Sequence, residues 1–476
     1  MLFNSFTFAL FLPLVFLLHW YVFSGNHKRQ NLILLISSYL FYGWWDYRFL
    51  SLIVISSLSD YIIALKLGQT SKPKHRKILL GASLLVNLGI LGFFKYYNFF
   101  IDTVVESFGH FGIQVNLYSL YVILPVGISF YTFQTLSYTL DVYRRTISPT
   151  KDLLSFMAYV SFFPQLVAGP IERASTLLPQ FKKARAFEFE KGKEGIKLVI
   201  WGLFKKVVIA DQCAIFVNEI FAAPGEYPGS MLFLGAIFFA FQIYGDFSGY
   251  SDVAIGTAKL FGIDLMRNFR YPYFARDIAE FWRRWHISLS SWFRDYLYIP
   301  LGGSRVGTLG RIRNVIIIFT VSGAWHGANW TFIVWGFLHG LYYIPLLLSQ
   351  STRVHLDEVG HQRLLPSGKE FLQMAVTFLL VSFAFIFFRS ESLYSAGFFI
   401  KAMVSFDSWA FPGWRMLYML GWIVLLVAIE WLNRDKLHPF NFDHRPFFMK
   451  YCIYGMVSYL IVAFSYNGQQ FIYFQF

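Results

Sequence analysis

The sequence has few charged residues for its length. Asp, Glu, Lys and Arg make up 14% of the 476 residues, against 56% hydrophobic residues, whereas soluble domains have about 25% charged residues. A helix crosses a hydrocarbon core with about 20 residues, and a soluble helix must present a polar face to water. The composition therefore excludes a soluble enzyme. The stretches that hold no Asp, Glu, Lys or Arg include 4–23, 78–94, 119–140 and 371–388.

These apolar stretches predict spanning helices, because they are continuous and do not alternate apolar with polar residues as the strands of a barrel do. A basic region in front of the first apolar run is also lacking, since Lys28 is the first basic residue. The run 4–23 is therefore predicted to be a retained span and not a cleaved secretory signal.

Cysteine is nearly absent. Cys213 and Cys452 lie far apart in apolar sequence without the spacing of metal ligands, so no metal site is predicted.

Positive charge is in excess, with a formal net charge of +14. The basic residues gather in a few loops, which the positive-inside tendency of membrane proteins explains without a nucleic-acid partner. Placing those loops in the cytoplasm predicts about eleven spans with both termini outside the membrane. The side of loop 350–370 stays open, and the whole chain, 1–476, is predicted to form a single membrane domain.

The apolar run 152–169 does not fit this alternation, because both of its flanks are basic. From Arg173 to Lys206 there are nine Lys or Arg and three Glu. We predict a re-entrant segment, broken at Pro164 and at Gly169-Pro170, which needs protein around it at membrane depth.

Carboxylates at the end of the predicted span 231–248 form the first candidate site. Asp246 and Asp252 lie in the glycine-containing stretch 245–252, and charged groups near membrane depth suggest either function or an ion pair. The alternative interpretation is that both pair with arginines at the membrane interface.

The second candidate site is the segment 277–300. Asp277 and Glu280 have the spacing of a capping box, which predicts one amphipathic helix at the cytoplasmic interface, ending before Pro300. His286 lies on the face of that helix that carries Trp282, and its alternative role is a hydrogen-bonded packing residue. A stripe at helical spacing would face the membrane interface, where indole rings are favoured. It consists of Trp285, Leu289, Trp292 and Tyr296, and the charge of the helix comes from Arg283, Arg284 and Arg294.

The third candidate site, 322–329, interrupts an apolar stretch that runs from Val315 to Leu348. His326 lies there between glycines, and an ionisable group in mid-membrane is a functional hypothesis by default. An imidazole can take and return a proton near neutral pH. The alternative is that His326 bonds a carbonyl group that the helix break has freed.

Taken together, these sites resemble the membrane-bound O-acyltransferase family, in particular its bacterial branch of alginate O-acetylases and peptidoglycan O-acetyltransferases. The resemblance implies an all-α polytopic membrane protein, a ring of about eleven transmembrane helices with re-entrant and interfacial helices, in which a cytoplasmic tunnel meets an extracellular funnel. It implies that His326 is the catalytic histidine and His286 the second functional one. The matching motifs are 281–290, 325–327, 163–170, 246–252 and 294–299.

The resemblance extends to the aromatic C-terminal segment, 467–476, which is predicted to lie outside the cytoplasm. It implies that Tyr473 carries the acyl group covalently, whereas the residues alone equally fit an interfacial anchor.

Further substrate or tunnel candidates are Trp282, Trp285, Trp325, Asn329, Asp246, Asp252, Arg283 and Arg294.

The resemblance predicts an O-acetyltransferase of the bacterial cytoplasmic membrane. It would take acetyl from acetyl-CoA or another acyl thioester, with no bound cofactor, and pass it toward an extracytoplasmic polysaccharide. Alginate is favoured and peptidoglycan is the alternative. Membrane lipid and a periplasmic esterase-like O-acetyltransferase would be partners. The rival class is a proton-coupled transporter, although the sequence has no internal repeat of the kind transporters show.

Overall fold

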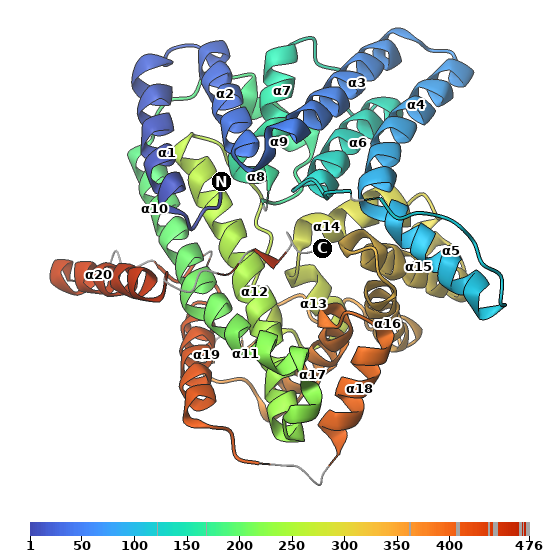
Figure 1. The fold of residues 1–476 in the computed structure, drawn as a ribbon. Coiled ribbons are helices and arrows are strands. Elements are labelled where there is room, and N and C mark those ends of the chain that lie inside the picture. Colours follow the sequence, from blue (N-terminus) through green and yellow to red (C-terminus); the bar gives the residue numbers. More distant parts are fainter. Residues whose placement is uncertain are drawn as a thin grey trace. The chain divides into compact units, whose positions relative to one another are not determined.

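The computed structural model describes most of the chain, and all of its regular elements in that part are helical. The helices form two compact units, Met1–Ile196 with Ala254–Met266 and Lys197–Val253 with Arg267–Phe476. Helices α10 (Phe189–Phe204) and α12 (Gly229–Leu260) contribute residues to both units (Figure 1). The described residues are 1–120, 122–167, 169–360, 363–405, 410–436, 438–440, 446–465, 469 and 471–472.

Unit 1 contains the N-terminal helices. A buried polar network joins three of them, because the carboxylate of Asp60 accepts hydrogen bonds from Ser83 Oγ at 2.5 Å and Asn87 Nδ2 at 2.8 Å, and Asn87 Oδ1 accepts from Thr135 Oγ1 at 3.1 Å. The helices are α1 (Phe6–Leu17), α2 (His27–Asp46), α3 (Leu50–Gln69), α4 (Pro73–Leu91), α5 (Tyr97–His110), α6 (Ile128–Arg144), α7 (Leu153–Ser161), α8 (Phe163–Leu166) and α9 (Ala174–Phe181).

Unit 2 contains the candidate site. Between α10 and α11 the chain forms a π-helical turn, η4 (Lys205–Ala210), of a kind that is frequent at functional sites. The helices are α11 (Asp211–Ala222), α13 (Ile278–Arg284), α14 (Ile287–Phe293), α15 (Thr308–His326), α16 (Trp330–Leu348), α17 (Gly368–Arg389), α18 (Leu393–Val404), α19 (Trp414–Leu432) and α20 (Phe447–Phe464).

Seven helical segments in the described part of the chain are long and apolar enough to cross a membrane. The prediction of a polytopic membrane protein is thereby confirmed. The first predicted span corresponds to a shorter apolar helix, Phe6–Val22. The seven segments are His27–Gln69, Pro73–His110, Gly229–Leu260, Trp330–Leu348, Gly368–Arg389, Trp414–Leu432 and Phe447–Phe464.

Two of the predicted segments can be compared directly with the structure. A break is present in the predicted region, but it lies at Phe162, between the short, largely buried helices α7 and α8, and Pro164 falls in the first turn of α8. The prediction of a span over 119–140 is wrong in its first part, since α6 begins only at Ile128. Pro125 lacks an amide hydrogen and Gly127 adopts a left-handed φ of +75°, so this apolar stretch cannot continue a helix.

Candidate active site

His326 is the last residue of α15, and α16 begins four residues later, so the helix break predicted within 322–329 is confirmed. The two helices pack backbone against backbone. A Cβ atom on Gly323 would lie 2.2 Å from the carbonyl oxygen of Phe332, and one on Gly336 would lie 2.2 Å from that of Phe319. Small residues permit this approach between membrane helices. The α15–α16 pair is thus a close-packed hairpin with a buried histidine at its turn.

His286 lies at a helix break that the sequence analysis did not predict. Segment 277–300 begins as expected, with the Asp277 side chain accepting from the amide of Glu280 at 2.6 Å. It is not one helix, however, because α13 ends at Arg284 and His286 adopts a left-handed φ of +42°. That conformation is costly for a residue other than glycine and persists only where the surroundings impose it. Here the amide of Ile287 donates to the carbonyl oxygen of Asn268 at 2.9 Å.

The same segment is not an interfacial surface helix either. Of the four residues predicted to form its interfacial stripe, Trp285, Leu289 and Trp292 are buried within the protein and Tyr296 is partly buried. Trp285 packs against Phe269 and Phe281, with ring centroids 5.0 and 5.5 Å away. The aromatic residues therefore build the protein interior around His286 and do not anchor a helix on lipid.

Asn268 fixes the orientation of the His286 ring. Its Oδ1 lies 3.2 Å from His286 Nδ1 and also accepts from the amide and the hydroxyl of Ser288, at 3.2 and 2.9 Å. Because this oxygen can only accept, Nδ1 carries the proton and Nε2 carries the lone pair. Burial lowers the pKa of His286 to about 3, so the ring is neutral near neutral pH and can act as a hydrogen-bond acceptor.

The two histidines singled out in the sequence come together. Their ring centroids are 6.4 Å apart, although 40 positions separate them in the chain. Trp325 contacts both, with its ring 6.1 Å from His286 and 5.0 Å from His326. Trp335 and Phe388 lie 5.1 and 5.5 Å from His326. The result is a pair of imidazoles in an aromatic, low-dielectric shell, where polar interactions are stronger than in water.

His339 is a third buried histidine, which the sequence analysis missed. It lies on α16, accepts a hydrogen bond at Nδ1 from the indole of Trp282 at 3.3 Å, and has the Trp335 ring 5.0 Å away. Trp335 in turn contacts His326. The rule that singles out ionisable residues inside apolar spans would have found His339. Asn268 carried no such signal, since it lies in a polar loop.

Asp246 and Asp252 are ion-paired, as the alternative interpretation of this site expected, but their partners are lysines of η4 and not interfacial arginines. Lys206 Nζ lies 2.6 Å from Asp246 Oδ1, and Lys205 Nζ lies 2.8 Å from Asp252 Oδ2. The motif also lies inside the continuous helix α12 and not at the end of a span. Gly249 of this motif allows α12 to pack closely against α10, because a Cβ atom at this position would lie 2.6 Å from the carbonyl oxygen of Gly202.

Three other candidates have local contacts away from the histidine pair. Arg283 donates to the carbonyl oxygens of Thr352 and His355 at 2.8 and 2.7 Å. Arg294 is exposed and bonds its neighbour Asp295. Asn329 caps α16 by accepting from the amide of Thr331 at 3.0 Å. Tyr473 lies outside the described residues.

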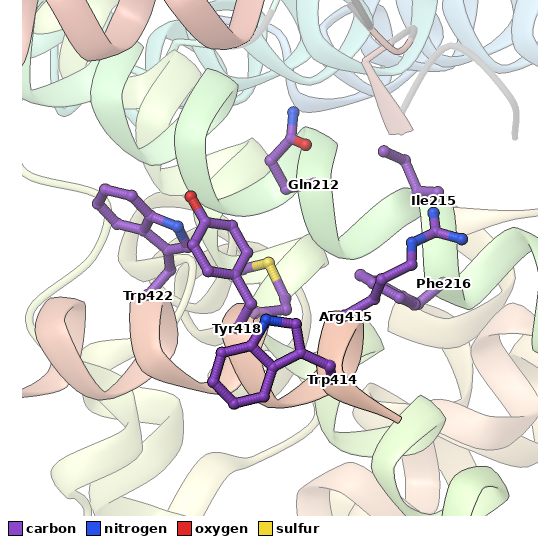
Figure 2. Close-up of a pocket in the computed structure, with 8 residues that line it drawn as sticks. Gln212, Ile215, Phe216, Trp414, Arg415, Tyr418 and Trp422 are labelled. Carbon is purple, nitrogen blue, oxygen red and sulfur yellow. The ribbon is translucent and has the colours of Figure 1, made fainter. Parts of the chain in front are cut away.

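A separate cavity of about 250 Å³ opens between α11 and α19. Figure 2 shows Trp414, Tyr418 and Trp422 on α19 facing Gln212 on α11. None of the residues predicted from the sequence lines this cavity, so it is distinct from the histidine pair.

Comparison with known proteins identifies the family of this chain. The profile of the MBOAT, membrane-bound O-acyltransferase, family matches residues 117–363, which include both His286 and His326. A probable alginate O-acetylase AlgI of Pseudomonas putida is 42% identical over 436 residues, 91% of this chain and 86% of that protein.

The names of two less similar relatives refer to other polymers. A peptidoglycan O-acetyltransferase of Helicobacter pylori is 36% identical over 437 residues, 86% of this chain and 80% of that protein. A teichoic acid D-alanyltransferase of Bacillus subtilis is 26% identical over 281 residues, 56% of this chain and 69% of that protein. With its family profile, its extended similarity to O-acetylases and its buried histidine pair, the chain belongs to the membrane-bound O-acyltransferase family.

Proposed function

We propose that this protein moves an acetyl group from a cytoplasmic thioester, with acetyl-CoA as the favoured donor, toward hydroxyl groups of an extracytoplasmic polysaccharide. The observation that carries the proposal is the approach of His286 and His326 to within 6.4 Å in a buried aromatic shell. Alginate is the favoured acceptor, because the alginate O-acetylase of Pseudomonas putida covers 91% of the chain at 42% identity.

The reaction needs a base at the acyl carbon. In the proposed step a hydroxyl oxygen attacks the thioester carbonyl, its proton passes to His326, the new C–O bond forms and the C–S bond breaks. The proton then returns to the departing thiolate, so His326 ends as it began. His286, held by Asn268 with its lone pair on Nε2, serves as the second functional group and orients the reactants.

Tyr473 is the proposed first acceptor. A phenol is a better leaving group than an aliphatic alcohol, so a tyrosyl ester divides one difficult transfer into two easier ones. A periplasmic esterase-like O-acetyltransferase would complete the second transfer to the polysaccharide. This order of events requires the C-terminal segment to lie outside the cytoplasm, as the basic loop before α20 predicts.

The proposed setting is a bacterial cytoplasmic membrane. We expect about eleven spans in a ring with re-entrant pieces, since α2 and α3 have 20 residues each, enough for one span apiece. A tunnel from the cytoplasm would admit the donor and an outer funnel would release the product, with both termini outside. The proposed tunnel-lining residues are Trp325, which contacts both histidines, Trp282, which bonds His339, and Trp285, which packs against Phe269.

The experiment uses purified protein in liposomes with acetyl-labelled CoA and two acceptors, mannuronate oligosaccharide and peptidoglycan fragments, with and without the periplasmic partner. We expect label on the C-terminal peptide and then on the alginate-type acceptor. Tyr473→Phe, which keeps the ring and removes only the hydroxyl, should abolish both signals while CoA release by hydrolysis persists.

Other outcomes separate the alternatives. Preferred labelling of peptidoglycan fragments would assign the function that the Helicobacter pylori relative has by name. Normal transfer by Tyr473→Phe would remove the tyrosyl carrier. Absence of any acetyl transfer, together with proton uptake coupled to solute movement, would overturn the enzyme assignment in favour of a transporter.

A further inference from the structure

The last described residues of the chain are buried in unit 2. Phe471 and Ile472 are 0% and 2% exposed. Figure 1 shows this short red segment beside α12. An apolar chain end that served only as a membrane anchor would be expected to face lipid, so this burial calls for a specific partner.

The partner is a cluster of three buried charges. Lys206 Nζ lies 2.6 Å from Asp246 Oδ1 and 2.7 Å from Asp211 Oδ1, and all three side chains are at most 3% exposed. One ammonium group thus faces two buried carboxyl groups. Burying such a group is costly unless further hydrogen bonds satisfy it.

The chain end supplies those bonds. The amide of Ile472 donates to Asp246 Oδ2 at 2.6 Å, and Lys206 Nζ donates to the carbonyl oxygen of Gln469 at 3.1 Å. An ammonium group has three donors. Asp211, Asp246 and the Gln469 carbonyl account for all three, so the C-terminal segment completes the bonding of Lys206.

A neighbouring ion pair shows what a simple contact between helices looks like. Lys205, adjacent in sequence, bonds Asp252 at 2.8 Å and the hydroxyl of Ser248 at 2.9 Å. It uses one carboxylate, and both of these partners lie on α12. The second carboxylate and the backbone contacts are therefore features of the Lys206 cluster that joining η4 to α12 does not require.

Aromatic contacts lead from the chain end to the candidate active site. The Phe471 ring lies 4.3 Å from Tyr250 and 6.1 Å from Phe247. Phe247 contacts His286 edge-on, with centroids 4.7 Å apart. One aromatic ring thus separates the docked segment from His286.

We propose that Lys206, Asp211, Asp246 and Tyr250 form a docking site for the chain's own C-terminal segment and act as positioning residues for acyl transfer. The docking site holds Gln469 and Ile472 by their backbone, one aromatic ring away from His286. The purpose of docking rests on the proposed transfer through Tyr473, whereas docking itself can be measured independently of that transfer.

The test follows the reactivity of a reporter thiol in the full-length protein. Cys452, which is exposed, is replaced by Ser, and Ile472→Cys introduces a buried thiol that keeps the backbone amide. Cys213 stays in place, because it is buried and reports unfolding when it reacts. The purified protein is treated with N-ethylmaleimide, and mass spectrometry reads labelling at each site.

We expect slow labelling of the reporter at position 472. Asp246→Asn should raise its rate roughly ten- to a hundredfold, the range for losing a hydrogen bond to a charged group. Asp252→Asn, the matched change in the neighbouring pair, should leave the reporter rate unchanged, and Cys213 should stay unreactive in every variant. Asp246→Asn should also lower acetyl transfer.

A second pair of variants leaves the charge cluster intact. With the reporter moved to Phe471→Cys, Ile472→Pro removes only the amide that bonds Asp246, whereas Ile472→Ala keeps it. The proline variant alone should release the reporter. Docking is overturned if the reporter at 472 reacts as fast as native Cys452, or if both Asp246→Asn and Ile472→Pro leave labelling unchanged. Normal transfer by Tyr473→Phe with a protected reporter would instead sink the tyrosyl carrier and leave docking in place.

Discussion

Both units bury an aspartate inside apolar helices, and the two aspartates are held in different ways. Asp60 in unit 1 accepts hydrogen bonds from Ser83 and Asn87, both neutral side chains of α4. Asp246 in unit 2 bonds the ammonium of Lys206 and the backbone amide of Ile472. The first set of contacts joins neighbouring helices, whereas the second also holds a segment 226 residues away in the sequence.

The comparison teaches that the partners of a buried polar residue, and not its type, separate structural from functional roles. Both carboxylates obey the rule that a polar group at membrane depth must be satisfied. The neutral network around Asp60 needs nothing outside the helices that form it. The bonding of the charged cluster around Asp246 is complete only with the chain end, whose Phe471 lies one aromatic ring away from His286. The following variants test this distinction between the units.

The largest effect is expected from removing His326 of unit 2, compared with removing a buried histidine of unit 1. His326→Ala should lower acetyl transfer by roughly a hundredfold or more, the usual contribution of a general base. His19→Ala is the matched control, because His19 in unit 1 is equally buried and contacts Trp20 and Phe261. Turnover of labelled acetyl-CoA by equal amounts of membrane-inserted protein is the measurement. Equal losses in both variants would contradict the catalytic assignment.

His286→Gln should reduce turnover by up to about a hundredfold, the cost of a small misplacement of reacting groups. Because burial holds the pKa of His286 at about 3, the ring is neutral throughout the neutral range. The acid limb of the pH–rate profile should therefore remain in the variant. A lost acid limb would show that His286 itself titrates in the reaction.

The same pKa predicts a change in stability with pH. Its folded value, about 3, lies below the unfolded value of about 6.5, so the unfolded chain binds a proton that the folded chain does not. Stability therefore falls as the pH drops from about 6.5 toward 3. Thermal unfolding in detergent at pH 7 and pH 4.5 should show a smaller difference for His286→Gln than for the unchanged protein.

A smaller difference between the units is expected when a helix glycine of each is replaced by alanine. Gly336→Ala should push α16 from α15, because its Cβ would meet a backbone oxygen at 2.2 Å. Overpacking of this kind costs about 1–3 kcal/mol of stability and should displace His326. Gly81→Ala on α4 in unit 1 meets nothing within 4 Å and should be neutral or slightly stabilising. Thermal unfolding and turnover of both variants check this, and an active, fully stable Gly336→Ala would contradict the close-packed hairpin.

Local rules predicted much of unit 2 from the sequence. Apolar length gave the spans, the spacing of Asp277 and Glu280 gave a helix start, and the glycines around His326 gave a helix break. Each of these depends on residues close in the sequence, so no knowledge of the fold was needed.

The remaining features depend on tertiary contacts. The left-handed turn at His286 is imposed by Asn268, which no periodic pattern connects with it. Lys205 and Lys206 were counted in a basic cytoplasmic flank, although they are buried and the carboxylates of Asp252 and Asp246 neutralise them. Charge counting treats every lysine as solvated, and so it cannot recognise an ion pair whose acidic partner lies 40 residues further along the chain.

The smallest functional effect is expected at Asp60. Asp60→Asn keeps the size of the side chain but turns one acceptor into a donor, so the bond from either Ser83 or Asn87 is lost. Losing one buried hydrogen bond costs about 1–3 kcal/mol, and the melting temperature in detergent should fall accordingly. Turnover per folded molecule should stay unchanged, because this network contacts neither histidine. Asp246→Asn, the same substitution in unit 2, should lower turnover in molecules that remain folded. If Asp60→Asn reduced turnover in folded protein as strongly as Asp246→Asn does, the distinction between a neutral structural network and a charged docking site would be wrong.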